Sequence, residues 1–147
     1  MKRASIVTRE IEVARLIESV RSASHGAISV FIGTVRETND GREVSGIEYS
    51  AYTAMAQDEM ERILDEAENL SGVSAAVVEH RVGLLEIGDI SIAIVSAHAH
   101  RAPAIDSNRY IIEEIKKRVP IWKLEHYVDG TREWVDPTHA TQQPSPA

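Results

Sequence analysis

The apolar residues of this chain alternate between two spacings, and this alternation constrains the fold more than any other feature. Three segments, 10–21, 54–70 and 103–119, carry apolar residues every three or four positions, the spacing of one helix face. Shorter runs rich in Val, Ile and Thr favour strands, and they cover 4–7, 27–36, 44–52, 75–82, 89–98, 121–128 and 132–135. The order β-α-β-β-α-β-β-α-β-β predicts an α+β domain with a mixed sheet.

Local signals mark where these segments end. Ser71-Gly72 closes the second helix, Pro120 stops the third, and Asp129-Gly130 predicts a hairpin between the last two strands. Two stretches are expected to connect strands without being strands themselves. One is the polar segment 37–43, a loop with a turn or mobile segment at Asn39-Asp40-Gly41, and the other is the connection 83–88. The inward face of the second helix is predicted to consist of Ala56, Met60, Ile63, Leu64 and Ala67.

The length of 147 residues, without a repeat or a linker, indicates a single domain. We place it at residues 1–137 and expect 138–147, rich in Thr, Gln, Ser and Pro, to be a disordered tail. The longest apolar runs are too short to span a bilayer, and no secretory leader is recognisable. We therefore expect a cytoplasmic protein.

Charge and cysteine content exclude several classes of function. The net charge of −7 argues against general nucleic-acid binding, which needs a basic face, but it permits a local basic pocket for a small anion. The chain has no cysteine, which excludes disulfides, thiolate metal sites and cysteine nucleophiles.

The lysines are the most informative candidates for chemistry. Twelve of the sixteen basic residues are arginine, yet three of the four lysines, Lys116, Lys117 and Lys123, lie around one junction between a helix and a strand. Lysine can lose its proton when desolvated, whereas arginine stays charged. The alternative is a solvated last helical turn that complements the helix dipole. Lys123 fits that alternative less well, because it follows Trp122 in a strand and should point to the opposite face.

Two further clusters could bind an anion. His100 and Arg101 precede the helix of Pro103, whose free backbone N–H groups favour phosphate or carboxylate. His98 and His100 could together ligate zinc, but no acidic partners complete such a site, so no metal is expected. Arg36 is the last residue of a predicted strand and could hold an anion with its guanidinium fork. The alternative for both is that these are ordinary polar residues at the end of a strand and bind no ligand.

Taken together, these segments resemble the molybdopterin synthase large (catalytic) subunit family. The similarity runs from about residue 26 to 136 in the expected order. It is carried by Gly33-Thr34-Val35-Arg36, Gly41, Tyr49, Tyr52, Met55-Ala56, His80-Arg81-Val82-Gly83, Ile87-Gly88-Asp89, His100-Arg101-Ala102, Lys116, Pro120-Ile121-Trp122-Lys123-Leu124-Glu125, Asp129-Gly130 and Trp134-Val135. One departure lies after Val135, where many relatives have a basic residue and this chain has Asp136-Pro137-Thr138-His139.

The resemblance implies a hammerhead-like α/β fold and a homodimer within a heterotetramer. Each large subunit would bind a small ubiquitin-like carrier whose C-terminal Gly-Gly thiocarboxylate supplies sulfur to cyclic pyranopterin monophosphate, forming the molybdopterin dithiolene. By match, Lys116 and Lys123 would be catalytic, Arg36, His100 and Arg101 would bind the substrate, and Phe31 would line the channel for the carrier tail. No cofactor is implied. A chain without cysteine agrees with an outside sulfur donor.

Two other classes of function remain open from the sequence. One is a binding module for an anion or nucleotide that performs no chemistry, and the other is a scaffold that only docks a ubiquitin-like protein. They differ in what the lysines do, because only an enzyme requires them for turnover.

Overall fold

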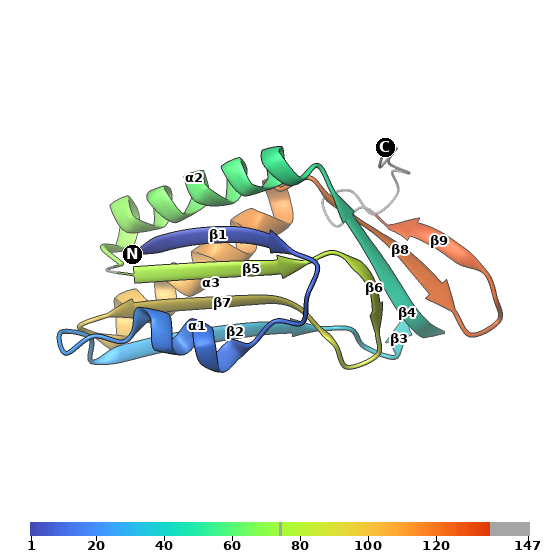
Figure 1. Cartoon of the computed structure of the whole chain (residues 1–147), viewed down its shortest axis with the longest axis horizontal. Helices are drawn as coiled ribbons and strands as arrows, with labels where there is room; N and C mark the ends of the chain where they lie inside the picture. Colours follow the sequence, from blue (N-terminus) through green and yellow to red (C-terminus); the bar gives the residue numbers. More distant parts are fainter. Residues whose placement is uncertain (74, 136–147) are drawn as a thin grey trace.

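The strands form two sheets, and the helices pack mainly against the first of them (Figure 1). The structure is a computed structural model that describes residues 1–73 and 75–135. The elements are β1 (Lys2–Val7), α1 (Val13–Val20), β2 (Ala27–Thr34), β3 (Thr38–Asn39), β4 (Arg42–Ala51), α2 (Thr53–Ser71), β5 (Ala75–Arg81), β6 (Gly83–Glu86), β7 (Ile90–His98), α3 (Arg101–Arg118), β8 (Ile121–Tyr127) and β9 (Arg132–Val135). The predicted α+β class is confirmed.

The first sheet has the strand order β1-β5-β7-β2 and is mixed, as predicted. Strand β1 runs parallel to β5, whereas β7 is antiparallel to both β5 and β2. Helix α1 packs on one face against Val77 and Val95, and α2 and α3 cover the other face, which includes Val78 and Ile94. Both faces of the central strands β5 and β7 are therefore buried, which explains their nearly continuous apolar runs.

Helix α2 shows how directly the apolar spacing specifies a buried face. All five residues predicted to point inward are buried: Ala56, Met60, Ile63, Leu64 and Ala67. Gly72 ends the helix at φ 68°, a left-handed conformation that glycine adopts without a steric penalty.

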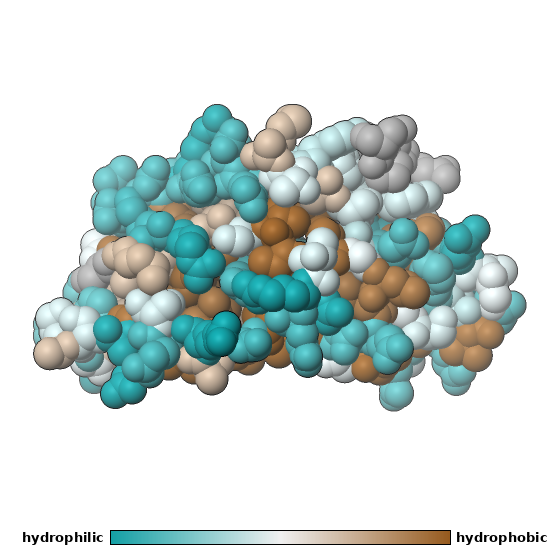
Figure 2. Space-filling view, viewed as in Figure 1, coloured by the Kyte–Doolittle hydropathy of each residue, from teal (hydrophilic) through white to brown (hydrophobic). Residues whose placement is uncertain are grey.

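The second sheet is built around β4, which pairs with β8 on one side and β6 on the other. Strand β9 pairs with β8 across the predicted hairpin, and β3 pairs with the start of β4. At the surface, Figure 2 shows mostly hydrophilic residues over α2 and apolar residues nearer the middle of the same face.

The predicted turn at Asn39-Asp40-Gly41 is confirmed, but both stretches also contain short strands that were not predicted, β3 and β6. In segment 37–43, Asp40 and Gly41 have φ values of 49° and 76°, the pair of left-handed residues that closes a two-residue hairpin between β3 and β4. In segment 83–88, β6 pairs with β4 at Gly46, where a Cβ would lie only 2.9 Å from the carbonyl oxygen of Leu85. The missing side chain at Gly46 lets β6 approach.

The predicted domain boundary at residue 137 and the predicted tail at 138–147 lie outside the described residues. Among the residues that are described, no helix is both long and apolar enough to cross a membrane.

Candidate active site

A pocket lies at the junction of the two sheets, beside the last turn of α3. Strands β2, β3, β4, β7 and β8 all contribute to its wall. Four of the six residues predicted for the site line it: Phe31, Arg36, Lys116 and Lys123. The other lining residues are Gly33, Thr34, Thr38, Asn39, Val44, Ile47, Tyr49, Ser91, Ile92 and Glu125.

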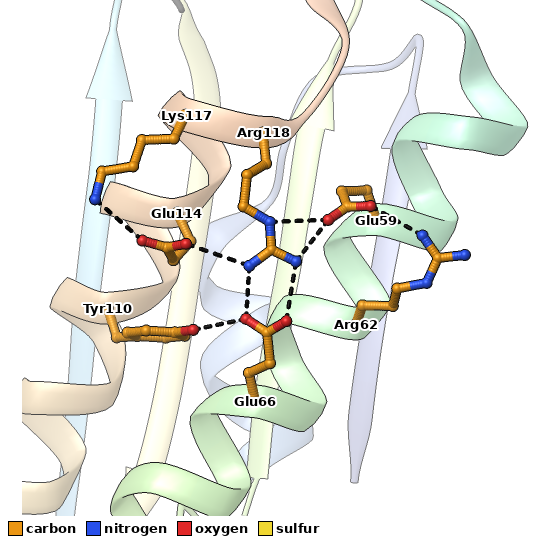
Figure 3. A network of polar contacts seen from close by, with 7 residues as sticks. All are labelled: Glu59, Arg62, Glu66, Tyr110, Glu114, Lys117 and Arg118. Atoms are coloured by element: carbon orange, nitrogen blue, oxygen red, sulfur yellow. Dashed lines mark hydrogen bonds and ion pairs between the residues drawn. The ribbon is translucent and has the colours of Figure 1, made fainter.

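Lys116 is held in place by an ion-pair network two residues further along α3 (Figure 3). The guanidinium of Arg118 lies 2.6 Å from Glu59 and 2.6 Å from Glu66, both on α2, and 3.2 Å from Glu114 on its own helix. Tyr110 also donates a hydrogen bond to Glu66 at 2.6 Å. These contacts fix the last turn of α3 against α2, and with it the backbone that carries Lys116.

The electrostatics around Lys116 differ from those of an ordinary surface lysine. The residue as a whole is exposed, but burial around its ammonium group lowers the pKa, and the nearby charge of Lys123 lowers it further. A lysine with a lowered pKa donates its proton more readily near neutral pH. The alternative of a solvated last helical turn therefore fits Lys117 better than Lys116, because Lys117 is exposed and pairs with Glu114.

Lys123 reaches the pocket because side chains alternate along β8. Lys123, Glu125 and Tyr127 share one face of the strand, and Trp122 lies on the opposite face against Tyr52 at 4.9 Å between ring centroids. The Lys123 side chain is 24% exposed, and its Nζ lies 3.7 Å from Oε1 of Glu125, which is only 1% exposed. The predicted division of Trp122 and Lys123 between two faces is confirmed, with Trp122 half-buried.

Tyr49 of the pocket wall packs against a buried histidine close to Lys116. The buried ring of His80 contacts Tyr49 edge-on, with 5.2 Å between centroids, and its Nδ1–H donates to the carbonyl of Arg81 at 3.0 Å. Burial lowers the pKa of His80 to about 4, and the charge of Lys116 contributes to the same shift. His80 is therefore neutral at pH 7 and adds no charge beside Lys116.

Arg36 and Phe31 enter the pocket from the end of β2. Gly33 lies between them at a bulge, and a Cβ there would lie 2.8 Å from Cγ2 of Ile92. Arg36 is exposed, and its Nη2 lies 3.5 Å from Oδ1 of Asn39. With Lys116 and Lys123 it gives the pocket three cationic groups against one carboxylate, a positive local balance in a chain of net charge −7.

His100 and Arg101 do not reach this pocket within one chain. His100 caps the start of α3 and Arg101 is its first residue, whereas Lys116 lies fifteen positions further along the same helix. At 1.5 Å per residue the separation is about 22 Å along the helix axis. The His100 backbone N–H donates to Nδ1 of His98 at 3.0 Å, and no cluster of three or more metal-ligating side chains occurs within 1–73 and 75–135.

Among the lining residues that were given no role from the sequence alone, three make polar or ring contacts near the lysines: Asn39, Tyr49 and Glu125. The alternation Lys123-x-Glu125 in a strand could have identified Glu125, because residues two apart share a face. Nothing in the sequence placed Asn39 beside it, since the two are 86 positions apart.

Comparisons with family models, curated proteins and solved structures all find similarity to the same kind of protein. The profile of the MoaE protein family matches residues 6–118. The molybdopterin synthase catalytic subunit of Halalkalibacterium halodurans is 38% identical over 99% of this chain and 94% of its own length. The crystal structure of molybdopterin synthase from Staphylococcus aureus is 37% identical, with a TM-score of 0.85 over 91% of this chain and 97% of that one. A chain in the complex of subunits 1 and 2 of the molybdopterin-converting factor from Helicobacter pylori is 25% identical. Its TM-score is 0.74 over 89% of this chain and 88% of that one.

Proposed function

The chain belongs to the MoaE protein family of molybdopterin synthase catalytic subunits, and we propose that sulfur transfer takes place in the pocket between Lys116 and Lys123. The enzyme is a sulfurtransferase. The donor in this proposal is the C-terminal thiocarboxylate of a small ubiquitin-like carrier, and the acceptor is cyclic pyranopterin monophosphate. The observation that carries the proposal is the pairing of two lysines from different elements in one partly desolvated pocket.

The proposed reaction replaces oxygen by sulfur on the pterin. The thiocarboxylate sulfur forms a bond to a pterin carbon, and the bond from that carbon to oxygen breaks. Water then cleaves the bond between sulfur and the carrier's acyl carbon, which leaves sulfur on the pterin and a carboxylate on the carrier. Two rounds give the dithiolene.

The two lysines have different roles in this proposal. Lys116, whose pKa is lowered, donates the proton to the departing oxygen, while the ammonium of Lys123 orients the anionic thiocarboxylate. Arg36 holds the phosphate of the pterin, and Phe31 lines the channel for the carrier tail.

His100 and Arg101 enter the proposal through a second copy of the chain. Because they lie about 22 Å from Lys116 along α3, they would complete the pocket of a neighbouring subunit in a homodimer. The edge strand β2, which exposes Ile28, Val30 and Ile32, supports assembly, since long apolar edge strands are usually covered. The H. pylori complex supports a second kind of partner, the carrier.

The second sheet offers further apolar surface that a partner could cover. Leu84 on β6 is 63% exposed, and Ile87 and Val128 are exposed in nearby turns. Figure 2 shows apolar residues at the surface in this part of the molecule. We propose a heterotetramer of two catalytic subunits and two carriers, working in the cytoplasm.

The experiment that tests this function is reconstitution with thiocarboxylated carrier and the pterin precursor, followed by measurement of the dithiolene product. Lys116→Ala and Lys116→Arg should both lose nearly all activity while still binding the carrier, because arginine keeps the charge but does not release its proton near neutral pH. Lys123→Ala should lose less.

The controls separate this proposal from the two non-catalytic classes. Lys117→Ala changes the adjacent exposed lysine and should remain active. Absence of product with the wild-type protein would favour a binding module or a scaffold. Normal single-turnover product formation by Lys116→Arg would reduce Lys116 to a docking residue.

A further inference from the structure

Asn39 joins the two sides of the pocket through its side-chain amide. Its Nδ2 donates to both oxygens of Glu125, at 2.9 and 3.0 Å, and its Oδ1 faces Nη2 of Arg36 at 3.5 Å. The orientation of the amide follows from these partners, because the NH₂ group must face the carboxylate and the carbonyl must face the guanidinium. Asn39 is half-buried and belongs to β3, the short strand that the hairpin turn at Asp40-Gly41 folds back on β4.

Glu125 is the group that most needs such a partner. It is 1% exposed, and a buried carboxylate is costly unless hydrogen bonds satisfy its oxygens. Asn39 supplies bonds to both oxygens, and the Tyr127 hydroxyl supplies another at 2.8 Å. Burial and the bond to Glu125 raise the pKa of Tyr127 to about 12, so this hydroxyl remains a donor throughout the neutral range.

Because Asn39 and Tyr127 already donate hydrogen bonds to Glu125, Lys123 is not needed to satisfy this carboxylate. Its Nζ stays 3.7 Å from Oε1 of Glu125, close enough for attraction but longer than a charge-assisted hydrogen bond. The ammonium hydrogens are thus free of a tight bond to Glu125. Without the Asn39 amide, the buried carboxylate would lack two hydrogen bonds, and Lys123 is the nearest cation that could replace them.

We propose that Asn39 is a positioning residue for sulfur transfer, which satisfies the Glu125 carboxylate so that the Lys123 ammonium faces the pocket. This inference rests on the proposed function. Asn39 touches no reacting atom, and its effect on the reaction passes through Lys123.

The test is the single-turnover rate in the reconstituted enzyme with saturating carrier and pterin precursor. Asn39→Ala should lower the rate on the order of tenfold, the effect of losing hydrogen bonds to a charged group. In a Lys123→Ala background the same substitution should have almost no further effect, because residues that act through one another are not additive. Glu43→Gln is the matched control, since Glu43 pairs with Thr38 in the same hairpin but is exposed, and it should match the wild type.

A second variant provides a readout that a purely structural role would not change. Asn39→Asp keeps the shape but places a carboxylate against Glu125, so the two groups should share a proton and have one raised pKa. Its rate relative to the wild type should therefore be lower at pH 8 than at pH 6, where the shared proton restores one donor. This variant also serves if Asn39→Ala does not fold.

The outcomes separate this inference from the function on which it rests. A wild-type protein without product, or Lys123→Ala with full activity, refutes the proposed function. If the wild type is active and Lys123→Ala is defective, the proposed function stands and the role of Asn39 can be judged separately. A normal rate for Asn39→Ala then overturns that role. So does a double variant in which Asn39→Ala causes its full loss of rate again. A pH-independent deficit in Asn39→Asp also overturns it.

Discussion

Replacing Arg118 by glutamine should destabilise the protein by about 2 kcal/mol at pH 7. The substitution removes three ion pairs, to Glu59, Glu66 and Glu114, and leaves three carboxylates facing one another between α2 and α3 (Figure 3). Partly exposed pairs contribute about 0.5–1 kcal/mol each, and the two-pronged contact with Glu66 places this network toward the upper part of that range.

The effect should depend on pH in a defined direction. Hydrogen bonds from Arg118, and then from Tyr110, lower the pKa of Glu66 from 4.5 to about 2. A carboxylate with a lowered pKa stabilises the fold fully above its unfolded value, near 4.5, and this contribution is lost as the pH falls through about 2. The Glu66 side chain is 38% exposed, so solvent screening limits its own share to about 1 kcal/mol.

Urea unfolding at pH 7 and at pH 3 measures this prediction. The stability difference between wild type and Arg118→Gln should narrow at pH 3, where part of the Glu66 contribution is already lost. Arg62→Gln is the matched control, because Arg62 is more exposed and pairs with Glu59 at the edge of the same network, so it should cost less than about 0.5 kcal/mol. An equal loss in the two variants, or a difference that stays constant with pH, would refute the reasoning.

Two further predictions concern the substrate pocket. Arg36→Ala should weaken binding of the phosphorylated precursor by about 1.5 kcal/mol. This is the lower end of the range for a hydrogen bond to a charged group, because Arg36 is exposed. Calorimetry that finds unchanged affinity would remove Arg36 from the site. Mixing Lys116→Ala dimers with Arg101→Ala dimers under conditions of subunit exchange should raise activity above that of either variant alone, because each mixed dimer contains one pocket with both residues intact. If activity does not rise although mixed dimers are detected, the pocket is not shared between subunits.

The sequence alone was enough to specify the secondary structure wherever side-chain periodicity reflects burial on one face. The inward face of α2 agreed residue by residue, and the turns at Gly72 and Asp129-Gly130 were recognised because few residues adopt their backbone conformations. The alternation along β8 likewise placed Lys123 on the face opposite Trp122.

The tertiary structure decided those features whose cause lies in distant backbone or in partners far apart along the chain. Strand β6 forms because Gly46 lets another backbone approach, and no periodicity in 83–88 reports that contact. The contact between Asn39 and Glu125 joins positions 86 residues apart, so local sequence contained no signal for it. The shift in the pKa of Lys116 likewise depends on burial and on the charge of Lys123, and both follow from how the pocket is assembled in the folded chain. Local patterns determine which face a side chain occupies, whereas its neighbours, and with them its chemistry, depend on how the elements pack.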